Sequence, residues 1–165
     1  MELLLIRHGI AEGRDATRWP DDQGRPLTGD GAAKFRKESK VIGALVPKVD
    51  ALLTSELTRA LQTAEILHEE LGWPAPETRD ELAAGTDPKA MAGLLEPLEH
   101  AEAVALVGHE PDLSEFASYL LAGDPDAVAI ELKKGGVISL GIEGGPTPGE
   151  AVLYWAIPPR VLRGS

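Results

Sequence analysis

The sequence contains no cysteine, and this absence removes several kinds of chemistry at once. A chain without thiols forms no disulfide, has no thiolate nucleophile and offers no cysteine ligand to a metal ion. Long apolar runs are also missing. No segment approaches the ~20 apolar residues of a membrane span, and the N-terminal run is shorter than the ~7–15 residues of a signal-peptide core. The sequence therefore predicts no association with a membrane, and we expect a cytoplasmic location.

Positive charge is scarce as well, with 16 lysine and arginine residues against 27 aspartate and glutamate residues and a formal net charge of −11. A charge of this sign argues against nucleic acid as a partner, because nucleic acid requires a basic face. It would also repel a phosphate substrate at long range, so the capture of one would depend on a local cluster of cations. Any arginines that the fold brings together are therefore conspicuous.

The length and the remaining composition are those of an ordinary soluble globular chain. With 165 residues, of which 43% are hydrophobic and 26% charged, the sequence fits one domain spanning residues 1–165. A chain of this length buries roughly two thirds of its unfolded surface. The sequence has no internal repeat, low-complexity tract or change in composition that would mark a second domain.

Short apolar runs predict the strands. Leu3–Ile6 and Ala103–Val107 are continuous apolar runs, too short for helices, and are typical of strands buried on both faces of a parallel sheet. A turn rich in glycine and proline joins two further strands near the C-terminus. Strands are expected at residues 3–6, 49–54, 75–78, 103–107, 137–142 and 151–157.

Apolar residues at helical spacing predict the helices between these strands. Phe35, Ile42 and Leu45 fall on one side of the first helix, which Thr28 or Asp30 can cap, and we expect that side to be buried. Helices are expected at residues 31–46, 60–71, 88–95 and 111–122.

The alternation of strand and helix predicts an α/β fold, a three-layer α-β-α sandwich with a mostly parallel central sheet and a C-terminal hairpin at one edge. Between the first strand and the first helix, the polar stretch Ile10–Leu27 is expected to form a long loop. Long ordered loops in compact domains are often functional.

Three strand ends deliver basic or polar groups to the same edge of this sheet. Arg7 and His8 follow the first strand, Ser55 and Arg59 follow the second, and His109 follows the strand that begins at Ala103. Each arginine could simply form an ion pair, and each histidine could be a hydrogen-bonded structural residue. Independent structural roles do not explain one shared edge, however. The joint placement favours a binding site for a dianion such as a phosphoryl group.

Metal binding by His8 and His109 is the weaker interpretation. The neighbouring arginines would repel a dication, and we assign no carboxylate to a matching strand end. We expect no metal and no cofactor. The other two histidines, His68 and His100, are expected at the surface.

At these residues the sequence resembles the histidine phosphatase superfamily, the phosphoglycerate-mutase-like group. Arg7-His8-Gly9 is similar to the Arg-His-Gly signature of that family, and residues 26–31 are similar to the Leu-Thr-x-x-Gly segment that opens its first helix. Residues 55–64 match its Ser-x-x-x-Arg-Ala-x-Gln-Thr-Ala stretch, and Gly108-His109 matches its late Gly-His pair. Each match is short, but four in the family's order are specific together.

The resemblance implies a role for each residue. His8 would be the nucleophile that carries the phosphoryl group as phosphohistidine, while Arg7, Arg59 and His109 would hold the phosphoryl oxygens with Ser55 nearby. These roles agree with physical chemistry. A neutral imidazole has the lone pair that attack requires, and the arginine fork matches phosphate oxygens. Phosphoryl transfer asks mainly for positioning and charge stabilisation, which this set would supply without a metal ion.

Two departures from the family's pattern narrow the expected substrate. The glutamate that serves as proton donor in ester-cleaving members falls at Ala84 here, and Ile10 replaces a glutamate that often follows Arg-His-Gly. An ester oxygen is a poor leaving group without a donor, which is typically worth ~10²–10⁴ in rate, whereas an imidazole needs much less help. Glu81 or Glu12 could in principle be recruited instead.

The segment 79–102 is also short, which leaves little material for a lid over the site. An open cleft suits a phosphorylated side chain on another protein better than an enclosed sugar phosphate. Together with the missing donor, this favours the SixA-like branch, phosphohistidine phosphatases of phosphorelay proteins. The expected partner is then a phosphohistidine-bearing phosphotransfer domain.

Three other interpretations stay open. A small phosphate-ester phosphatase would use Glu81 or Glu12 as its acid and would take a small phosphorylated substrate. A mutase is disfavoured, because it must exclude water from the phosphoenzyme. A non-catalytic phosphate-binding module would tolerate the loss of His8, whereas an enzyme would not.

Overall fold

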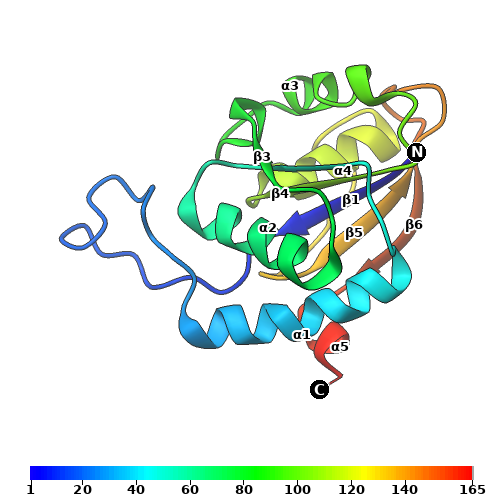
Figure 1. Cartoon of the computed structure of the whole chain (residues 1–165). Coiled ribbons are helices and arrows are strands. Elements are labelled where there is room, and N and C mark those ends of the chain that lie inside the picture. The colour runs from blue at the N-terminus through cyan, green and yellow to red at the C-terminus, as the bar shows by residue number, and fades with distance from the viewer. Residues whose placement is uncertain (165) are drawn as a thin grey trace.

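Six strands form one mixed sheet in the computed structural model, which describes residues 1–164 (Figure 1). The strand order is β3-β2-β4-β1-β5-β6. The four strands from β3 to β1 pair in parallel, and β5 and β6 add antiparallel at the other edge. The strands are β1 (Glu2–Arg7), β2 (Ala51–Thr54), β3 (Glu77–Thr78), β4 (Ala103–Gly108), β5 (Val137–Gly141) and β6 (Val152–Ile157).

Helices cover both faces of this sheet and complete the predicted three-layer α/β sandwich (Figure 1). The apolar residues of α1, α2 and α5 pack in one core, and those of α3 and α4 pack in a second core on the opposite face. The helices are α1 (Gly29–Leu45), α2 (Thr58–Leu71), α3 (Pro88–Gly93), α4 (Asp112–Ala122) and α5 (Pro159–Arg163), with 3-10 turns η1 (Asp80–Leu82) and η2 (Glu96–Leu98).

The central strand β1 shows why a continuous apolar run was required. Leu3 and Leu5 face the core of α3 and α4, while Leu4 and Ile6 face the core of α1 and α2. All four side chains are fully buried, because successive residues of a strand point to opposite faces. This burial fixes the position at which the chain leaves the sheet, immediately before His8.

The first helix differs from its prediction at both ends. It begins at Gly29, where the Thr28 side chain accepts a hydrogen bond from the Gly31 N–H at 2.8 Å. It ends at Leu45, so Val46 turns inward and is buried while Leu45 is 46% exposed. The expectation that Leu45 is buried is therefore wrong. Helical spacing cannot predict which side chain turns inward once the helix has ended.

A short C-terminal helix was not predicted. Helix α5 packs on α1, and its Leu162 is buried in the core of that face. Its five residues are too few for an amphipathic repeat, so periodicity carries no signal for it. Among the helices of residues 1–164, none combines the length and the apolar character needed to cross a membrane.

Candidate active site

The carboxyl ends of β1, β2 and β4 bring the predicted residues together. Arg7, His8, Arg59 and His109 line one cavity of about 320 Å³, and the fully buried Ser55 lies behind His109. The remaining walls come from the loop after β1, the segment before α3 and the segment before β5. The complete lining is Arg7, His8, Ala11, Glu12, Gly13, Arg14, Arg25, Arg59, Ala84, His109, Glu110 and Lys134.

The His8 ring is held in the tautomer that a nucleophile requires. Its Nδ1 lies 2.7 Å from the carbonyl oxygen of Gly9, and a carbonyl oxygen only accepts, so Nδ1 carries the proton. The other ring nitrogen, Nε2, then has its lone pair free. Burial of the ring is the largest cause that lowers the pKa of His8; the Gly9 hydrogen bond opposes it, the nearby His109, Arg59 and Arg7 add to it, and the resulting pKa is about 3. His8 is therefore neutral at pH 7.

His109 faces His8, with the two ring centroids 5.3 Å apart, and Ser55 fixes its orientation. The Ser55 Oγ lies 2.8 Å from His109 Nε2 and accepts from the Leu57 N–H at 3.2 Å. With that acceptance made, the hydroxyl proton is available for His109 Nε2. The other ring nitrogen, Nδ1, is buried and has no protein partner. Burial, followed by Arg59 and Arg7, lowers the pKa of His109 to about 4.

Arg7 and Arg59 supply the permanent positive charge of the cavity. The Arg7 Nη1 donates to the Leu132 carbonyl at 2.9 Å, and the Arg59 Nη1 donates to the Asp22 carbonyl at 3.2 Å. In both side chains the Nε atom is buried without a partner. Buried N–H donors are rarely left unpaired in folded proteins. Guanidinium groups beside a neutral imidazole are of the kind that can bind phosphoryl oxygens.

Two residues of the long loop support this cationic wall and were missed in the sequence. The Asp22 carboxylate bridges Arg25, at 2.7 Å from Nε, and Arg59, at 3.2 Å from Nη2. The Arg25 Nη1 also donates to the Glu12 carbonyl at 2.8 Å. Hydrogen bonding from Arg25 lowers the pKa of Asp22, and Arg59 lowers it further. Asp22 therefore orients Arg59 from a loop 37 residues away in the chain.

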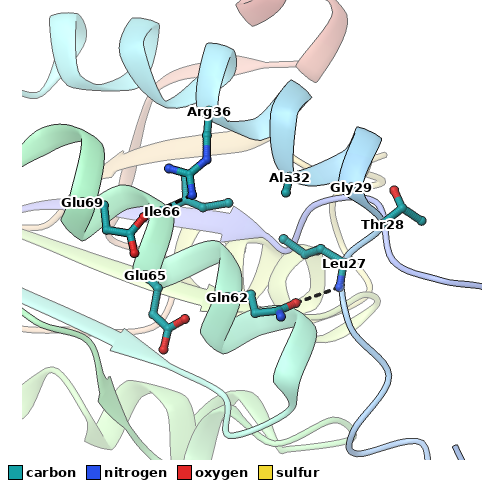
Figure 2. Close-up of a pocket in the computed structure, with 9 residues that line it drawn as sticks. All are labelled: Leu27, Thr28, Gly29, Ala32, Arg36, Gln62, Glu65, Ile66 and Glu69. Atoms are coloured by element: carbon teal, nitrogen blue, oxygen red, sulfur yellow. Dashed lines mark hydrogen bonds and ion pairs between the residues drawn. The ribbon is translucent and has the colours of Figure 1, made fainter.

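Helix α2 positions the loop after β1 as well as Arg59. The Thr63 hydroxyl accepts from the Gly9 N–H at 3.0 Å and donates to the Arg59 carbonyl at 2.8 Å. One residue earlier, the Gln62 side-chain oxygen accepts from the Leu27 N–H at 2.8 Å (Figure 2). Thus the polar residues of the Arg-Ala-x-Gln-Thr stretch reach the site and its loop, while Ala60 and its neighbour Ala64 pack in the core.

A second cavity, of about 250 Å³, lies between α1 and α2 beside this Gln62 contact (Figure 2). Its cation, Arg36, is already paired with Glu69 at 3.1 Å and with Glu70 at 2.8 Å. These pairs leave no free charge there for a phosphate, in contrast to the cavity at His8.

The segment before β5 contributes Lys134, a cation that sequence reasoning missed. This segment wraps the end of β1, since the Gly135 N–H donates to the Arg7 and His8 carbonyls at 3.1 Å each. A signal was present. Lys133-Lys134-Gly135 precedes a predicted strand, and an antiparallel strand begins at the edge where its parallel neighbours end.

The structure separates the carboxylates that could act as an acid. Glu81 lines a different cavity with Glu77 and Arg79, so it does not reach His8. Glu12 lines the His8 cavity, and so does Ala84, the position to which the resemblance assigns the family's donor. Glu110, which directly follows His109, also lines it. The expectation that no carboxylate follows a matching strand end is therefore wrong for Glu110.

These side chains make a cationic cavity in an anionic protein. Four arginines and Lys134 face Glu12 and Glu110, and burial holds both histidines neutral. In residues 1–164, no cluster of three or more histidine, aspartate or glutamate side chains is arranged to hold a metal ion. The arrangement can bind a dianionic phosphoryl group and offer it a neutral nitrogen nucleophile.

Comparison with known proteins assigns the chain to a family. The sequence pattern of the histidine phosphatase superfamily (branch 1) matches residues 3–85, which include Arg7, His8 and Arg59. An uncharacterized protein of Picosynechococcus sp. (strain ATCC 27264 / PCC 7002 / PR-6) is 39% identical over 143 residues, covering 85% of this chain and 84% of that protein. The chain belongs to the histidine phosphatase superfamily.

The chain is also similar to proteins and structures of named activity. A 2,3-bisphosphoglycerate-dependent phosphoglycerate mutase of Bradyrhizobium sp. (strain ORS 278) is 34% identical over 84 residues, covering 49% of this chain and 39% of the mutase. The fold resembles that of the protein histidine phosphatase SixA complexed with tungstate, with a TM-score of 0.83, 24% identity and coverage of 98% of this chain and 99% of SixA. An Escherichia coli K-12 structure described as a putative α-ribazole-5′-phosphate phosphatase has a TM-score of 0.74 and 19% identity, covering 96% and 98%.

Proposed function

We propose that the protein is a phosphatase that forms a phosphohistidine intermediate on His8 and dephosphorylates phosphohistidine on a phosphorelay protein. The observation that carries this proposal is the state of His8, a buried neutral imidazole with Nε2 free, in one cavity with unpaired donors of Arg7 and Arg59. In the reaction, Nε2 attacks phosphorus while the arginines and His109 bind the phosphoryl oxygens. Water then attacks the phosphoenzyme and releases phosphate.

The wall of the cavity supports a nitrogen leaving group rather than an ester oxygen. Ala84 stands where the superfamily's ester-cleaving members carry their donor, and it is the one residue of segment 79–102 that lines the cavity. An alkoxide needs a proton as it leaves, whereas an imidazole is a better leaving group. Segment 79–102 gives the cavity only this one residue, which supports a substrate presented by another protein.

The test measures phosphate release from a phosphohistidine-bearing phosphotransfer domain, an aryl phosphate and a sugar phosphate. We expect release from phosphohistidine to be at least about 100-fold faster than from either ester, since a general acid is worth ~10²–10⁴ in rate. His8→Ala should abolish it, and His100→Ala is the matched control because His100 is exposed. Ester hydrolysis as fast as phosphohistidine hydrolysis would contradict the substrate assignment.

A second candidate, a small phosphate-ester phosphatase, is favoured by one observation, the presence of Glu12 on the cavity wall. If Glu12 protonated an ester oxygen, Glu12→Gln would slow ester hydrolysis and leave phosphohistidine hydrolysis intact. A non-catalytic binding module would bind phosphate in the wild-type protein without turnover. His8→Ala would leave that phosphate affinity largely intact.

A further inference from the structure

The segment before β5 is bound to the chain at Arg7 and His8 through its backbone. The Gly135 N–H donates to the carbonyls of Arg7 and His8 at 3.1 Å each. The Arg7 side chain reaches the same segment, because its Nη1 donates to the Leu132 carbonyl at 2.9 Å. Lys134 lies between these two contacts in the sequence. Its position beside the proposed nucleophile is therefore fixed by the backbone on both sides.

Lys134 lines the His8 cavity without an ion pair. No carboxylate of residues 1–164 forms a salt bridge with its ammonium group. The carboxylates that line the same cavity are Glu12 and Glu110, and its other charged side chains are four arginines. A structural ion pair therefore does not explain why a lysine faces this cavity.

The surrounding charges oppose the protonated form of Lys134. Burial of part of the side chain is the largest cause that lowers its pKa, and the four arginines of the cavity add to it in the order Arg7, Arg25, Arg59 and Arg14. Like charges that share a site disfavour one another's charged forms. A dianion bound among them has the opposite effect, because it attracts all these cations at once.

We propose that Lys134 binds the phosphoryl group through its ammonium, in the substrate and in the phosphate product, and that its protonation sets the upper pH limit of phosphate binding. This inference rests on the proposed function, in which His8 is the nucleophile. The sequence pattern of the superfamily matches residues 3–85, so Lys134 lies outside it.

A lysine differs from the arginines beside it in two ways that suit this role. Its flexible stem carries a point charge with three donors, which can follow the phosphoryl oxygens as the group passes to His8 and then to water. An arginine stays charged at every relevant pH, whereas an ammonium with a lowered pKa loses its charge in the alkaline range. Phosphate affinity should therefore fall as pH rises through the pKa of Lys134. His8 and His109, with pKa values of about 3 and about 4, are neutral throughout that range.

Calorimetric titration with inorganic phosphate tests Lys134 without requiring turnover. At pH 8, we expect Lys134→Gln to raise the Kd by about tenfold, because a hydrogen bond from a charged donor is lost. Lys133→Gln is the matched control. It removes the same charge one residue away, from a side chain that lines a different cavity, and should change the Kd by less than about twofold. Equal Kd values in the two variants would overturn the assignment of Lys134.

Lys134→Arg separates the charge from its titration. This variant retains a cation that does not titrate, so its Kd at pH 8 should stay within about threefold of the wild-type value. Between pH 8 and pH 10, the phosphate affinity of the wild type should fall more steeply than that of Lys134→Arg. Glu12 and Glu110 face the cavity in both proteins, so their titration cancels in this comparison. An equally steep fall in both proteins would overturn the proposed pH limit.

Phosphate release from phosphohistidine distinguishes this inference from the proposed function. A wild-type protein that binds phosphate through Lys134 but releases none from phosphohistidine would contradict the proposed function and leave the assignment of Lys134 intact. Rapid release with the same KM in Lys134→Gln and the wild type would do the reverse. Because Lys134 is exposed, Lys134→Gln should unfold at the same urea concentration as the wild type, which separates weaker binding from loss of the fold.

Discussion

His8 combines burial with the absence of a carboxylate partner, and this decides how it titrates. In the serine hydrolase triad, an aspartate stabilises the histidine's charged form. Here a backbone carbonyl orients the ring, and the surrounding groups are arginines and a second histidine. The Gly9 contact raises the pKa of His8, but burial lowers it by more, so the ring stays neutral.

The low pKa of His8, about 3, predicts that this proposed nucleophile stays neutral in mild acid. An ordinary histidine with a pKa of ~6.5 is mostly protonated at pH 5, whereas His8 is still neutral there. We expect no loss of kcat/KM attributable to His8 between pH 7 and pH 5. An NMR titration of the His8 ring nitrogens checks this directly, with His100 as the exposed reference ring. A His8 titration midpoint above pH 6 would contradict the burial argument.

The lowered pKa of His8 also makes the stability of the fold depend on pH. Between pH 6.5 and pH 3, the unfolded chain takes up a proton at residue 8 that the folded chain does not. The contribution of His8 to the free energy of unfolding is therefore fully present above pH 6.5. It falls as pH decreases through this window, by up to about 1.4 kcal/mol per pH unit. Urea unfolding of His8→Gln should depend less steeply on pH than that of the wild type.

At the scale of the element, α1 and α2 support the site through short polar contacts. Thr28 caps α1 beside the loop after β1, and its N–H donates to the Ile10 carbonyl at 3.0 Å. Thr63 of α2 holds Gly9 from the other side. The turn that carries His8 is thus fixed by two helices at once.

Gly31 allows α1 to approach this turn, and we predict that Gly31→Ala disrupts it. A Cβ atom there would lie 2.2 Å from the Ile10 carbonyl oxygen, which is backbone and cannot rotate away. Activity should fall at least about tenfold and the unfolding free energy by about 1–3 kcal/mol, the range of an overpacked core. Gly29→Ala is the matched control in the same turn, since nothing lies within 4 Å of its Cβ position. Enzyme assays and urea titrations of both variants measure the difference, and equal behaviour of the two would refute the close-approach argument.

At the scale of the whole molecule, the C-terminus is joined to the site through one buried carboxylate. Glu38 of α1 is 2% exposed and pairs with Arg163 of α5 at 2.7 Å between Oε1 and Nη1. Its Oε2 lies 2.3 Å from the Cβ position of Gly135, which has a φ of 86° and donates to the carbonyls of Arg7 and His8. An ion pair between residues 125 apart in the chain therefore supports the segment that packs against the end of β1.

Removing this ion pair should destabilise the protein without changing its catalytic activity. Arg163→Ala leaves Glu38 buried without its cation, and we expect the free energy of unfolding to fall by about 1–3 kcal/mol. Arg160→Ala removes an exposed arginine from the same helix and should change it by less than about 0.5 kcal/mol. Thermal and urea unfolding measure both variants. If Arg163→Ala matched Arg160→Ala, the pair would contribute nothing to stability.

The sequence by itself determined the elements and the edge at which the site lies. Apolar runs such as Leu3–Ile6, the cap at Thr28 and the helical spacing on α2 are local patterns, and local patterns report the periodicity and ends of strands and helices. The strand-end positions of Arg7, His8 and His109 followed from the parallel alternation alone, because parallel strands end at one edge. Their catalytic roles stay predictions.

Only the tertiary structure decided which side chains complete the site. Asp22 orients Arg59 across a loop, Glu81 lines another cavity, and Glu110 lines the cavity at His8. None of these facts is periodic in the sequence. Each depends on contacts between segments far apart in the chain, and burial, charge and unpaired polar atoms are properties of such contacts. For that reason the sequence predicted a phosphoryl site, while the side chains that surround and support it emerged only from the folded chain.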